Sequence, residues 1–285
     1  MEHIATEITE AVLAVVGTQA QAAPGRGRLV VVCAETERHS LPARMIAELL
    51  RFDGFIVVFL GSATRPESLT GFLSTFRPDA LIVSCSVAMN LPSVVAMLTA
   101  AANAGVPALC GGRAFGSDES RALRLGASGW APDLDAAIEI IDRWGSQPPQ
   151  RVSMRAAAVA TAESLELARR SLVERCLAAK ARDRTSKTVA SADWRRREID
   201  ATLRFLAATI LLDDHSILTD FIAWLHERAR VEPQAYSDVG SLFATMSDVL
   251  ALERPAESAL LRAQINATGQ LLVHPGCAPN ITPQP

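Results

Sequence analysis

The sequence predicts a doubly wound α/β domain followed by an all-helical domain, and three observations carry this prediction. Between residues 28 and 145, short and continuous apolar runs alternate with amphipathic stretches. Such runs are typical of parallel strands buried on both faces, and their alternation with helices predicts βαβ units. Beyond residue 150 we find no strand pattern, and helical patterns follow one another. The segments 20–27 and 145–150 contain Pro and Gly and indicate linkers.

Five βα units account for the first domain. We expect strands at 28–34, 55–61, 79–86, 106–112 and 129–130, and helices at 41–52, 66–76, 91–104, 118–125 and 133–145. The apolar face predicted for helix 41–52 consists of Leu41, Met45, Ile46, Leu49 and Leu50. Five such units predict a parallel sheet in flavodoxin-like, Rossmann-like order. In that order strands one, three and four are neighbours, and ligands bind beyond their carboxyl ends.

The remaining chain divides into further segments. We expect residues 1–27 to hold a short helix and a linker, 28–150 the α/β domain, 151–272 a helical domain and 273–285 a flexible tail. The predicted helices of the second domain are 155–182, 192–212, 216–230, 237–253 and 255–268. Their apolar stripes predict a bundle or a globin-like fold.

Composition excludes several classes of protein. A formal net charge of −3 gives no general attraction to nucleic acid or to an anionic membrane. No apolar run is long enough to span a bilayer, and the acidic first residues are unlike a signal peptide. The 5 cysteines form no CxxC pair, and three of them fall in strand-like runs. We therefore expect reduced thiols and a cytoplasmic location.

Three predicted loops bring unusual residues to the carboxyl ends of neighbouring strands. The first carries Glu37 and His39, the second Ser84 and Ser86, and the third the pair Gly111–Gly112. Taken singly, each has a plain explanation: a solvated histidine, serines that bond their own loop, and a glycine turn. Taken together they favour a ligand site, because a carboxylate commonly orients a metal-bound imidazole and glycines admit a bulky ligand.

Residues 28–145 resemble the cobalamin-binding domain of methionine synthase, corrinoid methyl carriers, B12-dependent mutases and B12 photoreceptors. The family motif Asp-x-His-x-x-Gly stands here as Glu37-Arg38-His39-Ser40-Leu41-Pro42, the Ser-x-Leu motif as Ser84-Cys85-Ser86, and the Gly-Gly pair as Gly111-Gly112. The resemblance implies cobalamin, expected as adenosylcobalamin, with its displaced nucleotide tail inserted beside the sheet. His39 would then be the lower cobalt ligand and Glu37 its orienting partner. The other implied cobalamin contacts are Ser40, Leu41, Ser84, Ser86, Gly111, Gly112, Arg113 and Phe115.

The order of a cobalamin domain followed by a helical domain is similar to that of photocobilins, which carry a second, bilin chromophore. The stretch 199–233 carries most of this resemblance. Biliverdin needs acceptors for its pyrrole N–H groups and cations for its propionates. The implied bilin residues are Trp194, Arg197, Arg204, Asp214, His215 and Trp224. Their plain alternatives are a helix N-cap for the aspartate, a solvated face for the arginines and core packing for the tryptophans.

We therefore expect a cytoplasmic, non-enzymatic light sensor. Light acting on the cobalt–carbon bond or on the bilin would alter domain contacts, and through them a homo-oligomer (dimer or tetramer) or the binding of a downstream protein. Nucleic acid and membranes are not expected partners. One alternative is a corrinoid methyl carrier or mutase subunit. The other is a Rossmann-like regulator that binds a ligand other than cobalamin.

Overall fold

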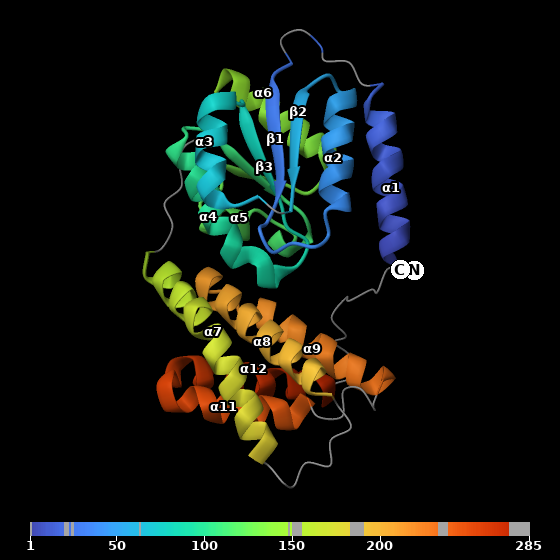
Figure 1. Cartoon of the computed structure of the whole chain (residues 1–285). Helices are drawn as coiled ribbons and strands as arrows, with labels where there is room; N and C mark the ends of the chain where they lie inside the picture. The colour runs from blue at the N-terminus through green and yellow to red at the C-terminus, as the bar shows by residue number, and fades with distance from the viewer. Residues whose placement is uncertain are drawn as a thin grey trace. The chain divides into compact units, whose positions relative to one another are not determined.

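The computed structural model describes residues 2–19, 23, 26–62, 64–147, 149, 156–182, 191–232 and 239–273. The chain divides into two compact units, Met1–Ala156 and Ala157–Pro285 (Figure 1). Among the helices of the described ranges, none combines the length and the apolar character that crossing a membrane requires. The tail predicted for 273–285 lies almost wholly outside the described residues, and so does Cys277.

The first unit contains one parallel sheet. Its strands are β1 (Arg28–Cys33), β2 (Ile56–Gly61), β3 (Ala80–Ser84), β4 (Ala108–Gly111) and β5 (Gly129–Ala131). They lie in the order β2-β1-β3-β4-β5, and all four neighbouring pairs are parallel. The predicted doubly wound fold of flavodoxin-like order is therefore confirmed, with β1, β3 and β4 side by side.

Helices cover both faces of this sheet (Figure 1). The helices are α1 (Glu2–Gly17), α2 (Leu41–Phe52), α3 (Pro66–Phe76), α4 (Leu91–Asn103), α5 (Ser120–Arg124) and α6 (Leu134–Ser146). α2 and α6 pack on one face through a shared core, α3 and α4 pack together on the other, and α1 packs against α2. Successive β1 residues from Leu29 to Cys33 are all fully buried, which explains why this strand reads as a continuous apolar run.

The apolar face predicted for α2 is wrong in part. Met45 and Leu49 are each 45% exposed, whereas Glu48 is only 3% exposed and is held by ion pairs to arginines of the same helix. The α2 residues that pack on the sheet core are Ala43, Ala47 and Leu50. Ile46 is partly buried against the same core, so the predictions for Ile46 and Leu50 are confirmed. The two alanines complete the buried face, and their small side chains let the helix lie close to the sheet.

The described residues of the second unit form helices joined by short turns. It contains α7 (Ala156–Arg182), α8 (Ala192–Leu212), α9 (Ser216–Val231), α11 (Val239–Glu253) and α12 (Pro255–Val273). The Ser191 hydroxyl caps α8 by accepting a hydrogen bond from the Trp194 N–H, and Asp213 ends the helix in the left-handed conformation. One hydrophobic core joins these helices, with Leu206, Met246 and Leu261 fully buried. The predicted helical second region is confirmed.

Candidate functional site

The carboxyl ends of β1, β3 and β4 form one row. Cys33 lies opposite Ser84, and Ser84 lies opposite Gly111. The loops that carry Glu37, Ser86 and the second glycine of the pair therefore start side by side. This row is the edge at which ligands bind in open parallel sheets.

Glu37 lies at the centre of this edge and is buried, with 2% of its surface exposed. Its Oε1 accepts hydrogen bonds from the backbone N–H of His39 at 2.9 Å and faces the ring Nδ1 of the same residue at 2.7 Å. Its Oε2 accepts from the backbone N–H groups of Ser86 at 2.8 Å and Val87 at 3.2 Å. The side-chain amide of Asn90 donates to the same oxygen at 3.2 Å. One carboxylate thus joins the loop after β1 to the loop after β3.

These contacts determine the charge of Glu37. Burial by itself raises the pKa of its carboxyl, but the hydrogen bonds from His39, Ser86 and Asn90 outweigh burial, so that the pKa lies below its ordinary value. Glu37 is therefore ionised at neutral pH. An ionised carboxylate only accepts hydrogen bonds, so the Nδ1 of His39 must carry the proton of this contact.

His39 consequently presents its other ring nitrogen, Nε2, for ligation. In a neutral imidazole protonated on Nδ1, the lone pair is on Nε2, and this lone pair is what a metal binds. The side chain is 60% exposed, whereas that of Glu37 is fully buried, so the ring extends from the sheet edge while its base is fixed. An imidazole oriented by a carboxylate in this way is a common arrangement among metal-ligating histidines.

The serines and glycines predicted at this edge differ in what they contact. Ser84 and Ser86 are half-buried, and it is the backbone N–H of Ser86 that binds Glu37. Gly112 has a φ of 104°, and a Cβ there would lie 2.4 Å from the carbonyl oxygen of Cys85. The protein's own backbone therefore requires glycine at this position. Whether Gly111 and the two serines contact a ligand stays a prediction.

The remaining predicted contacts flank this edge. Ser40 is the N-cap residue of α2, Leu41 is its first residue, and both are half-buried. Pro42, which stands where the family motif has glycine, occupies the first turn, where its missing N–H costs no hydrogen bond. Arg113 is exposed, whereas Phe115 is fully buried and packs into the fold, with no exposed surface to offer a ligand.

Asn90 is the site residue that sequence reasoning missed. It is 2% exposed, its amide N–H binds Glu37, and its Oδ1 accepts a hydrogen bond from the Thr36 hydroxyl at 3.0 Å. The signal available in the sequence was an amide side chain at the start of a helix, at the end of the stretch that carries both serines. N-capping is the ordinary explanation for such a residue. Here its side chain makes no capping bond and faces the carboxylate instead.

The six residues predicted to bind a bilin are spread along α8, the turn after it and α9, with Arg197 and Arg204 inside α8. Trp194 and Asp214 are near opposite ends of α8, about 30 Å apart along the helix. Asp214 accepts hydrogen bonds from the backbone and hydroxyl of Ser216 at the start of α9, in the manner of a capping residue. The Nδ1 of His215 contacts the Gln264 side chain at 2.9 Å. Trp224 is 41% exposed and stacks on its neighbour in α9.

Comparison with known proteins adds a family to this geometry. The profile of the B12 binding domain matches residues 27–139, which contain the whole edge described above. Among solved structures, a cobalamin-binding protein from Desulfitobacterium hafniense DCB-2 is similar, with 19% sequence identity and a TM-score of 0.38. The similarity covers 49% of this chain and 68% of that protein. No curated protein matches the chain. Residues 27–139 of this chain are thus similar to the B12 binding domain.

Proposed function

We propose that the chain holds cobalamin with His39 as the lower ligand of cobalt and uses it as a sensor. The observation that carries the ligand assignment is the contact between Glu37 and the Nδ1 of His39. Because the carboxylate is buried and ionised, it keeps the proton on Nδ1 and the lone pair on Nε2. The imidazole is thereby prepared for a metal before any cofactor arrives.

The residues of the chain fulfil distinct tasks in this proposal. Glu37 orients the ring, and Asn90 with the backbone of Ser86 and Val87 keeps Glu37 in place and charged. Gly111 and Gly112 border the edge without side chains. Cobalamin, when bound, would supply light-sensitive cobalt–carbon chemistry. The Nδ1–H of His39 would donate to Glu37, and the carboxylate would hold the imidazole in one orientation.

We further propose that the signal is light and that the output is regulatory rather than enzymatic. Support comes from the chain order, a cobalamin domain followed by a helical unit, which resembles that of photocobilins. In this proposal a change at the sheet edge shifts an equilibrium between conformations, which a second copy or a downstream protein reads. Cobalamin in its adenosyl form is the proposed light-sensitive state.

Biliverdin is part of the proposal only as a second chromophore of the helical unit. The best support is a stacked aromatic run that links α8 to α9. The rings of Phe205 and Phe221 lie 4.1 Å apart, and Phe221 is followed by the exposed Trp224 at 6.2 Å. Flat aromatic surfaces of this kind suit a conjugated ligand.

Spectroscopy of the cobalamin-loaded protein tests the ligand assignment. We expect reduced cobalamin in protein labelled with ¹⁵N-histidine to show two-line rather than three-line nitrogen splitting in its EPR spectrum, because the ligand nitrogen comes from the protein. The variant His39→Ala should lose this splitting, whereas Arg38→Ala, an exposed neighbour in the same loop, should keep it. Three-line splitting in the labelled protein would contradict ligation by His39 but not cobalamin binding.

Illumination tests the sensor assignment separately. Protein purified with adenosylcobalamin, with and without biliverdin, should change its absorption spectrum and its oligomeric state on exposure to light. A spectrum that is stable in light, together with methyl transfer in the dark, would instead favour the methyl-carrier alternative.

A further inference from the structure

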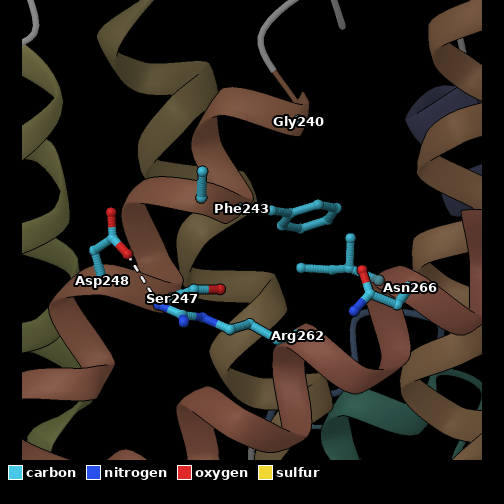
Figure 2. A pocket seen from close by; sticks show the side chains of 8 residues that line it. Gly240, Phe243, Ser247, Asp248, Arg262 and Asn266 are labelled. Atoms are coloured by element: carbon cyan, nitrogen blue, oxygen red, sulfur yellow. Dashed lines mark hydrogen bonds and ion pairs between the residues drawn. The ribbon is translucent and has the colours of Figure 1, made fainter.

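The helical unit contains a cavity that the proposed cobalamin function does not use. It lies between α11 and α12 and has a volume of about 370 Å³, within the range of small-molecule sites. None of the residues predicted to bind cobalamin or bilin is among those that line it. Figure 2 shows side chains from both helices around this space.

One side of the cavity is apolar. The ring of Phe243 forms its inner wall and is only 2% exposed, so the ring is fixed by the core behind it. Ile265 of α12 lines the cavity beside it, and Ala244 of α11 adds a small side chain that leaves the space open. An aromatic or branched hydrocarbon body would bury its surface against this wall.

The other side carries hydrogen-bond donors together with the carboxylate of Asp248. The guanidinium of Arg262 reaches from α12 to Asp248 of α11, where it donates a hydrogen bond at 2.9 Å (Figure 2). The amide of Asn266 and the hydroxyl of Ser247 also belong to the lining. Arginine, amide and hydroxyl groups together can bind a carboxylate, which accepts several hydrogen bonds at once.

Ser247 gives an independent indication of a ligand. It is 3% exposed, and its Oγ is buried without a hydrogen-bond partner in the described structure. A serine hydroxyl inside a helix usually bonds the carbonyl one turn before it, and leaving it unpaired is unfavourable. Because Ser247 lines the cavity, an acceptor atom of a bound molecule would satisfy this hydroxyl.

We propose that this cavity binds a small organic acid with an aromatic or branched apolar body and a single carboxylate. The body would lie against Phe243 and Ile265, and the carboxylate would accept hydrogen bonds from Arg262 and Ser247. The Arg262–Asp248 ion pair does not prevent this, because its side chains are 53% and 78% exposed and such pairs contribute little. The arginine can therefore turn to a ligand at small cost.

Titration with 2-naphthylacetate, followed by saturation-transfer NMR and by calorimetry on the full chain, tests the proposal. We expect saturable binding at one site with a Kd of about 1 mM or tighter. The neutral analogue 2-naphthylacetamide should bind about tenfold more weakly, because it loses the charge-assisted hydrogen bonds. The probe is not a cobalamin or bilin analogue, so the result does not depend on the proposed sensor function.

Two matched pairs of variants locate the site. Ala244→Leu fills the cavity and should abolish binding, whereas Ala251→Leu, at another exposed alanine of α11 outside the cavity, should leave it unchanged. Arg262→Gln should weaken binding about tenfold, whereas Arg230→Gln, on the exposed surface of α9, should not. All four positions are exposed, and circular dichroism checks that each variant folds. Absence of saturable binding, or binding that Ala244→Leu leaves intact, would overturn the proposal.

Discussion

Glu37 shows how one residue can serve both the fold and a cofactor. A buried carboxylate is costly unless hydrogen bonds satisfy it, and here every donor comes from two loops that a ligand site needs to hold together. The family motif has an aspartate at this position, and glutamate has a longer side chain. The added length suits a carboxylate whose two oxygens bind different loops: Oε1 faces His39, and Oε2 faces the loop after β3.

The lowered pKa of Glu37 predicts a pH dependence of stability. A group whose pKa is lower in the folded than in the unfolded chain stabilises the fold fully above the unfolded value, here 4.5, and loses this effect as pH falls through the folded value. The variant Glu37→Gln places an amide N–H against hydrogen-bond donors. It should therefore lower the free energy of unfolding by about 1–3 kcal/mol at neutral pH. It should also flatten the loss of stability below about pH 4.5.

Urea unfolding of the first unit between pH 3 and pH 7 measures this effect. Glu35→Gln is the matched control, because Glu35 is an exposed glutamate two residues earlier in the same loop. Equal pH profiles for Glu37→Gln and the unsubstituted chain would show that the carboxylate is not charged in the fold.

At the scale of elements, Gly112 is the residue on which the turn after β4 depends. A side chain there would meet a positive φ of 104° and a backbone carbonyl at 2.4 Å. We expect Gly112→Ala to destabilise the first unit by about 2 kcal/mol or more. Gly71→Ala is the control: Gly71 lies inside α3, nothing lies within 4 Å of the added Cβ, and the change should stabilise by about 0.5–1 kcal/mol. Similar urea midpoints for the two variants would contradict the geometry.

The extent of the elements was predictable from the sequence because each one follows a local rule. Continuous apolar runs gave the buried strands, and Pro42 and Pro92 lie in the first turns of α2 and α4. The pairing of Glu37 with His39 was also readable from their spacing. Tertiary contacts were less accessible: the buried face of α2 depends on alanines, which a search for large apolar residues overlooks. Asn90 was not predicted as a site residue because its partner, Glu37, is far away in the sequence.

At the scale of the whole molecule, two cores raise the question of whether the units communicate. The predicted cobalamin residues all belong to the first unit, and the cavity between α11 and α12 belongs to the second. If cobalamin binds only the folded protein, it stabilises the folded state by mass action. At a free concentration 100 times the Kd, this amounts to about 2.7 kcal/mol. A simple binding module would place all of this stabilisation in the first unit, whereas a sensor must transmit part of it.

Hydrogen exchange resolved by peptide mass therefore separates a sensor from a binding module. With adenosylcobalamin in the dark, exchange should slow in β1, β3 and the loops that carry His39 and Asn90. If the chain is a light sensor, illumination should reverse this protection and also change exchange in the helical unit, because a signal requires that both units respond to one event. In the His39→Ala variant, cobalamin should slow exchange at the sheet edge less in the dark. Illumination of this variant should leave exchange in the helical unit unchanged. Helical-unit exchange that is identical in dark and light would contradict the sensor role, while protection of the sheet edge alone would still support cobalamin binding at that edge.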